Sequence, residues 1–176
     1  MEVPDNNAEL KAINDQFKSK GALDRHDKLK FPHYVGGMNE SLKGWLNGSQ
    51  LAGSFALTLG GDHSLAIGTI GATSQKFGSE FCVVWVDAHA DINTPETTFS
   101  GNLHGCPVAF LLGLGSSNTV PGLEHSQSKL LTSRLVYIGL RDLDAGEKAI
   151  LKKHGIKAFS MHEVDKYGIG KVITKY

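Results

Sequence analysis

The strongest restriction on the fold of this chain comes from four short apolar runs, each followed closely by polar residues. The runs are Phe55–Leu59, Phe81–Val86, Leu135–Leu140 and Ile156–Ser160. Short and nearly continuous apolar runs are typical of strands that are buried on both faces of a parallel sheet. We therefore predict that the four runs form strands of one such sheet.

Helical sequence lies between the predicted strands, at Ser64–Phe77, Pro107–Leu114 and Ala145–His154. Alternation of strands and helices predicts an α/β fold, here a three-layer α/β/α arrangement with a mainly parallel sheet and helices on both faces. In such sheets ligands bind outside the carboxyl ends of the strands. The acidic and imidazole side chains of this chain fall at that edge.

The two ends of the chain are less clearly patterned. The first thirty or so residues are polar and allow either a helix or a loose surface segment. A helix with one apolar face is predicted over Ser41–Leu51, where Leu42, Trp45 and Leu46 have helical spacing. A final helical region is predicted near the C-terminus from its apolar residues Val164, Tyr167, Val172 and Ile173.

Composition limits the partners and the compartment of the protein. Lysine plus arginine equals aspartate plus glutamate at 18 each, and no basic stripe with interleaved aromatics suggests nucleic-acid binding. Two cysteines make a disulfide framework improbable and favour a reducing compartment. No signal peptide is visible, and no apolar run is long enough to span a membrane. We therefore expect a soluble, cytoplasmic protein with no membrane partner.

Three potential metal ligands follow the second predicted strand directly, in the segment Asp87-Ala-His-Ala-Asp91. In an extended backbone, alternate residues point to one side, so Asp87, His89 and Asp91 can converge. Oxygen and imidazole donors without thiolate suit manganese better than a structural zinc. The alternative is a charged loop in which His89 is hydrogen-bonded to a carbonyl group.

A second strand end offers a further imidazole, in the segment Gly60-Gly-Asp-His-Ser64. Asp62 or Ser64 could simply cap the helix that follows, but His63 is expected at the same sheet edge as His89. Two unrelated strand ends that both carry imidazole and carboxylate favour a metal site. Two ions about 3.5–4 Å apart would fit if Asp87 bridges them.

Together these segments resemble the arginases of the ureohydrolase family. The likeness is carried, in order, by Leu59–Gly68, Trp85–Pro95, Ser100–Gly105, Ile138–Glu147 and Phe159–Asp165. It is clear from about Phe55 to Val172 and faint before Phe55. By resemblance we expect an arginase/deacetylase-like α/β domain at residues 55–176 and a poorly matched N-terminal segment with a helix at residues 1–54.

The resemblance also implies roles for individual residues. The manganese ligands are His63, Asp87, His89 and Asp91, with Asp87 bridging, and His89 also lies on the substrate side. The residues that hold the substrate are Asn93, Ser100 and Asn102 for its α-carboxylate, and Asp144 for its α-ammonium group. His104 is the proton shuttle, a task that suits imidazole because its unperturbed pKa is near neutral.

Simpler structural roles compete with several of these assignments. Short polar side chains such as Asn93 and Ser100 commonly cap loops. Asp144 and Glu147 form a D-x-x-E pattern at a helix start, which favours a helix cap that could coexist with substrate binding. An isolated histidine such as His104 is more often structural, and only the resemblance indicates catalysis.

The function that the resemblance implies is manganese-dependent hydrolysis of L-arginine to L-ornithine and urea by a metal-bridging hydroxide. Two family elements are not found: an N-terminal strand with a glycine-rich loop, and an aspartate-rich strand end beyond the part matching Val172 that completes the metal cluster. We therefore expect a truncated arginase whose activity, and whose homotrimeric assembly, are complete only in the full-length protein.

The sequence also allows two other interpretations. The chain could be a truncated, non-catalytic product that binds metal weakly or pairs with full-length subunits. It could also belong to another ureohydrolase such as an agmatinase, whose substrate lacks the α-carboxylate. The segments Asn93-Thr-Pro95 and Ser100-Gly-Asn102 count against an agmatinase, because they match the carboxylate-binding loop.

Overall fold

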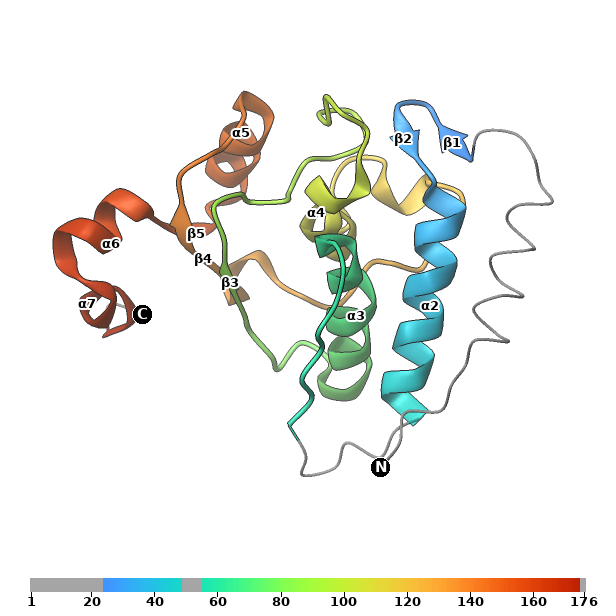
Figure 1. Cartoon of the computed structure of the whole chain (residues 1–176), viewed down its shortest axis with the longest axis horizontal. Coiled ribbons are helices and arrows are strands. Elements are labelled where there is room, and N and C mark those ends of the chain that lie inside the picture. The colour runs from blue at the N-terminus through green and yellow to red at the C-terminus, as the bar shows by residue number, and fades with distance from the viewer. Residues whose placement is uncertain (1–23, 49–54, 175–176) are drawn as a thin grey trace.

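A three-stranded parallel sheet forms the centre of the molecule (Figure 1). The computed structural model describes residues 24–48 and 55–174. The strands are β3 (Val83–Val86), β4 (Leu135–Leu140) and β5 (Lys157–Ser160), paired in that order. The expected strands at 81–86, 135–140 and 156–160 are thus confirmed, the first and last in shortened form.

Helices cover both faces of this sheet, as predicted for a three-layer arrangement. They are α4 (Pro107–Leu112), α5 (Ala145–His154), α6 (Met161–Tyr167) and α7 (Ile169–Thr174). Leu135 and Tyr137 of β4 pack in one core cluster with residues of α4 and α5. The alternate residues Val136 and Ile138 pack on the other face against Val172 of α7. The alternation of side chains along β4 therefore divides the core into two layers.

A second group of elements lies beside the sheet (Figure 1). It contains the hairpin of β1 (Arg25–His26) and β2 (Leu29–Lys30), the long helix α2 (Pro32–Gly48), and α3 (Ala66–Phe77). Four short 3-10 turns complete the described elements, at His63–Leu65, Leu103–Gly105, Ser117–Thr119 and Thr132–Arg134. Leu29 is fully buried here, in a cluster with Ile67, Leu103 and Phe110.

The predicted helices at 64–77, 107–114 and 145–154 are confirmed, with α5 matching its expected range. The helix expected from Ser41 begins earlier, at Pro32, whose fixed φ suits a first helical turn. Trp45 does not lie on the buried face as expected, since it is 52% exposed. Polar Asn39 lies there instead, and its Oδ1 accepts a hydrogen bond from the backbone N–H of Gly68 at 2.7 Å. The expected face residue Leu51 lies outside the described residues.

The prediction of a strand at Phe55–Leu59 was wrong. The segment is not paired with the sheet, and the side chains of Phe55 and Leu59 are 90% and 84% exposed. An open pocket lined by Thr58, Val84 and Val86 separates it from β3. A strand needs a hydrogen-bonded neighbour, and within residues 24–48 and 55–174 this segment has none.

A β-bulge at Gly139 shapes the carboxyl edge of the sheet, where φ of Gly139 is +93° and the pairing register with β5 shifts. Beyond the bulge, the backbone N–H groups of Arg141 and Asp142 both donate to the carbonyl of Ala88, at 2.9 and 3.0 Å. These bonds hold the loop after β3 against the end of β4. Among the described helices, none has the length and apolar character needed to cross a membrane.

Candidate metal centre

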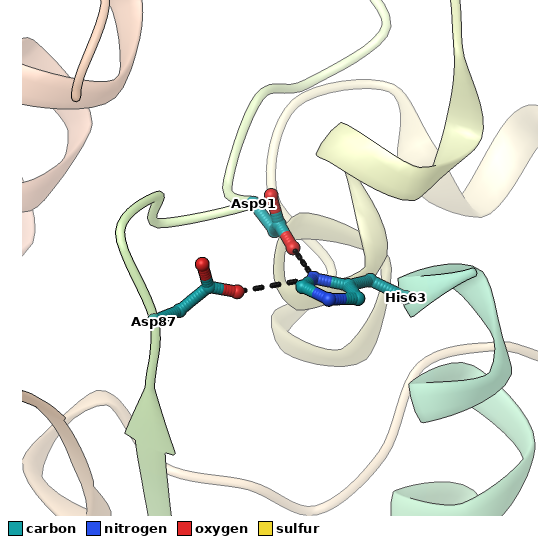
Figure 2. A group of neighbouring side chains, drawn as sticks. All are labelled: His63, Asp87 and Asp91. Atoms are coloured by element: carbon teal, nitrogen blue, oxygen red, sulfur yellow. Dashed lines mark hydrogen bonds and ion pairs between the residues drawn. The ribbon is translucent and has the colours of Figure 1, made fainter. Parts of the chain in front are cut away.

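One imidazole and two carboxylates converge at the carboxyl edge of the sheet (Figure 2). The Nδ1 atom of His63 lies 2.6 Å from Oδ2 of Asp91 and 3.0 Å from Oδ2 of Asp87. One donor atom from each of the three residues lies within 4.8 Å of the others. A single divalent cation could therefore contact all three.

The two carboxylates reach this point because of the strand and loop that carry them. Asp87 directly follows β3, and its Oδ2 accepts a hydrogen bond from Nε1 of Trp85 at 3.2 Å. Asp91 has a left-handed backbone with φ of +48° and is almost fully buried. The hydroxyl of Tyr137 donates to the carbonyl of Ala90 at 2.7 Å, so the strand β4 fixes the loop just before Asp91.

The imidazole arrives from a different element, the 3-10 turn that begins at His63. Asp62 caps this turn by accepting from the backbone N–H of Ser64 at 2.9 Å. The capping role expected for Asp62 is therefore present, while the His63 ring is directed at the carboxylates. The ring also lies edge-to-face against Trp85, with centroids 6.1 Å apart.

The electrostatics of the cluster favour a positive charge between the carboxylates. The hydrogen bond with Asp91 raises the pKa of His63 above its usual value, and the charge of Asp87 acts in the same direction. Burial raises the pKa of Asp91, and the His63 hydrogen bond opposes this effect. A cation bound here would take the place of the proton on His63, since imidazole coordinates metals only in its neutral form.

His89 lies on the other side of Asp87 and outside the group of three. Its Nδ1 is 3.6 Å from Oδ1 of Asp87, and its Nε2 is 3.3 Å from Oδ2 of the exposed Asp142. The backbone N–H of His89 also donates to Oδ1 of Asp87 at 3.0 Å. The two oxygens of Asp87 thus face two different imidazoles, an arrangement that would suit a carboxylate bridging two ions.

Two of the expected substrate-binding residues are in direct contact. Nδ2 of Asn93 donates to Oδ2 of Asp144 at 2.7 Å, and Oδ1 of Asn93 accepts from the Thr97 hydroxyl at 2.7 Å. Asp144 also forms a capping box with Glu147 at the start of α5, so the helix-cap role is present. Burial would raise the pKa of Asp144, but hydrogen bonds from the backbone N–H of Glu147 and from Asn93 lower it overall. Asp144 therefore remains a carboxylate at neutral pH.

The other three expected residues lie on the loop that leads into α4. Ser100 is exposed, and its Oγ accepts from the backbone N–H of Asn102 at 3.2 Å. Oδ1 of Asn102 accepts from Nζ of Lys30 at 2.9 Å. His104 is exposed, and within the described chain its ring has no hydrogen-bond partner. The loop thus presents short polar groups and one free imidazole to solvent.

Sequence reasoning missed several residues that hold these groups in place. Tyr137 and Trp85 carry polar atoms within apolar strand runs. A buried hydroxyl or indole N–H needs a hydrogen-bond partner, so the sequence could have indicated that these two side chains bind a nearby loop. Thr97 and Lys30 had no comparable signal. Their contacts depend on how separate loops come together, which the local pattern does not encode.

The chain is similar in sequence and in fold to proteins of known family. The Arginase family profile matches residues 11–176. An arginase from Glaciozyma antarctica is 53% identical over 148 residues, which cover 83% of this chain and 43% of that protein. The solved arginase of Bacillus caldovelox superposes with a TM-score of 0.77 at 39% identity, covering 88% of this chain and 53% of that one.

A further solved structure, an Entamoeba histolytica arginase in complex with L-ornithine, matches with a TM-score of 0.76 at 30% identity, covering 84% of this chain and 50% of that one. The chain spans about half the length of the curated relatives that it matches. The sequence match and the parallel sheet with helices on both faces agree with one another. This chain belongs to the arginase family.

Proposed function

We propose that this chain carries part of the active site of a manganese-dependent arginase, which hydrolyses L-arginine to L-ornithine and urea. The observation that carries the proposal is the convergence of His63, Asp87 and Asp91 at the carboxyl edge of the sheet. We propose that the activity also needs residues outside this chain, which spans about half the length of the curated relatives that it matches. The family membership favours this reaction over unrelated metal-dependent hydrolysis.

The chemistry of the donors fits manganese. Two carboxylates and one imidazole, without thiolate, are hard and borderline ligands that suit Mn²⁺. His63, Asp87 and Asp91 would hold one ion, and Asp87 with His89 would contribute to a second. Such ions, when bound, lower the pKa of water and so supply a nucleophile at neutral pH.

The residues around the cluster would bind and orient the amino-acid end of the substrate. Asn93, Ser100 and Asn102 would receive the α-carboxylate, and the ionised Asp144 would receive the α-ammonium group. His89 would face the substrate from the metal side. L-Ornithine in the Entamoeba histolytica relative supports an amino-acid ligand of this kind. The exposed His104 ring, free of competing hydrogen bonds among the described residues, would carry a proton to the departing amine.

Urea release tests the proposal. With Mn²⁺ present, a full-length form is expected to release urea from L-arginine and to turn over agmatine far more slowly. Substituting Asp91→Ala should abolish the reaction, whereas Asp165→Ala, on the exposed side of α6, should leave it unchanged. Preference for agmatine would contradict the proposal. Urea release by residues 1–176 alone, at a rate near that of the full-length form, would exclude a truncated, non-catalytic product.

We further propose that residues 55–176 form the partial arginase-like α/β domain and that residues 1–54 form an N-terminal segment that carries a helix. The full-length protein would act in the cytoplasm as a homotrimer. Sedimentation of the full-length protein tests the assembly: a mass of three chains is expected, and a monomer would contradict it.

A further inference from the structure

The β1–β2 hairpin is packed directly on the loop that carries Ser100 and Asn102. The backbone N–H of Lys30 donates to the carbonyl of Gly101 at 2.9 Å. The carbonyl of Lys28 approaches Gly101 so closely that a Cβ atom there would lie 1.9 Å from it. Leu29 is fully buried between these two contacts. The hairpin and the loop therefore form one packed unit, although about 70 residues separate them.

Within this unit one contact involves an expected substrate-binding side chain. Nζ of Lys30 lies 2.9 Å from Oδ1 of Asn102, and the contact is partly buried. An ammonium group only donates hydrogen bonds, so the carboxamide atom that faces Lys30 must be the oxygen. The NH₂ group of Asn102 is thereby turned away from Lys30, and no acceptor among the described residues engages it.

We propose that Lys30 is a positioning residue for carboxylate recognition. By holding Oδ1 of Asn102, it leaves the NH₂ group of Asn102 as a preoriented donor for the α-carboxylate of the substrate. The inference rests on the proposed function for the role of Asn102. A hydrogen bond from the Asn102 NH₂ group to a carboxylate is charge-assisted and therefore strong, so an NH₂ group oriented by Lys30 favours guanidines that carry a carboxylate over those that lack one.

Substituting Lys30→Met tests this role, because it retains the length of the side chain and removes the ammonium. Lys28→Met is a matched control: Lys28 lies on the same hairpin and also binds this loop, but its Nζ donates to the backbone carbonyl of Glu96 at 3.1 Å. Lys30→Arg is the rescue variant, since a guanidinium can still donate to Oδ1 of Asn102.

Calorimetry with Mn²⁺ present gives the first readout. Lys30→Met is expected to weaken L-arginine binding about tenfold, the loss that accompanies removal of one hydrogen bond to a charged group. Agmatine binding should be unchanged, and Lys28→Met and Lys30→Arg should bind L-arginine like the wild type. The proposal would be overturned if Lys30→Met weakened the binding of L-arginine and of agmatine equally. It would also be overturned if Lys30→Met and Lys28→Met weakened L-arginine binding equally.

Nuclear magnetic resonance of the Asn102 side-chain NH₂ group gives a second readout that needs no ligand. In the wild type and in Lys28→Met this group is expected to be ordered, and in Lys30→Met it should become mobile. An Asn102 side chain that is equally mobile in all three proteins would overturn the role of Lys30. Absence of L-arginine binding by the wild type would count against the proposed function alone, and the Asn102 mobility would then decide the role of Lys30.

Discussion

Asp87 interacts with different groups through its two carboxylate oxygens. Oδ2 faces His63 and the Trp85 indole, and Oδ1 faces the backbone and ring of His89. Its position at the end of β3 follows from the parallel pairing with β4, which places Val86 opposite Ile138. At the scale of single residues, the candidate metal centre therefore depends on contacts that fix the loop after β3.

Tyr137 provides the most buried of these contacts, and removing its hydroxyl should weaken the fold. In Tyr137→Phe the carbonyl of Ala90 stays buried and loses its hydrogen-bond donor. We expect the free energy of unfolding to fall by about 1–3 kcal/mol, the cost of an unsatisfied buried acceptor. Urea unfolding followed by tryptophan fluorescence measures this change. Unaltered stability would show that the hydroxyl does not hold the loop before Asp91.

At the scale of elements, the β1–β2 hairpin and the loop that carries Ser100 and Asn102 meet at Gly101. Its φ of +71° and its contact with the carbonyl of Lys28 leave no room for a side chain. Gly101→Ala should cost about 1–3 kcal/mol from backbone strain alone, and the clash should add to this. Gly105→Ala is the control, because nothing lies within 4 Å of its ideal Cβ.

Hydrogen exchange at the backbone N–H of Lys30 measures the effect of Gly101→Ala locally. Exchange should be faster in Gly101→Ala than in Gly105→Ala, because the bond from Lys30 to the carbonyl of Gly101 must lengthen or break. Equal exchange rates in the two variants would contradict the close approach of hairpin and loop.

Glu96 anchors the same loop from its other end and should make stability depend on pH. Burial alone would raise the pKa of Glu96, but hydrogen bonds from Ser116 and Thr94 lower it to about 2. A carboxyl group with a lowered pKa stabilises the fold at pH values above its ordinary pKa of 4.5. This stabilisation is lost as the pH falls from 4.5 towards 2. The difference in unfolding free energy between the wild type and Glu96→Gln should therefore shrink over that range. A constant difference would contradict this role.

Much of the fold was predictable from local sequence, and particular elements show why the rest was not. α5 was predictable because Asp144, Glu147 and the following glycine at position 155 specify both of its ends. The run Phe55–Leu59 looked equally clear as a strand. Whether this run forms a strand depends on a neighbouring strand with which it can pair. A local apolar run contains no information about that neighbour.

In the candidate site, too, some features follow from the local sequence and others depend on contacts between distant segments. The position of Asp87 and Asp91 was predictable, because both follow a strand of the parallel sheet at its carboxyl edge. His63 was expected at the same edge, but the strand on which that expectation rested is not formed, and His63 comes instead from a 3-10 turn. The separation of His89 from that group of three was not predictable, because it depends on side-chain directions after the strand. The Lys30–Asn102 contact joins two loops, and no periodic pattern relates them.

At the scale of the whole molecule, the two faces of β3 differ. Val83 and Trp85 pack against the core, whereas Val84 and Val86 are 55% and 74% exposed. On that same face α6 and α7 cover β4 and β5, as Figure 1 shows. Adjacent apolar side chains left uncovered on a sheet favour association.

The chain should therefore associate as its concentration rises, and Val84→Thr with Val86→Thr should reduce this tendency. Threonine keeps the β-branched shape that suits a strand while adding a hydroxyl. Sedimentation velocity over a range of concentrations measures the change, with circular dichroism as the check that the fold is retained. Identical sedimentation of both proteins would show that this face does not drive association.

Titration of the purified chain with Mn²⁺ tests the candidate metal centre. Calorimetry should detect Mn²⁺ binding to the wild type and a loss of affinity of at least about 100-fold in Asp91→Asn, beyond the 10- to 100-fold typical of residues that only support a ligand. Asp165→Asn should bind like the wild type. Absence of Mn²⁺ binding, or equal affinity in Asp91→Asn, would contradict the assignment of His63, Asp87 and Asp91 as the metal ligands.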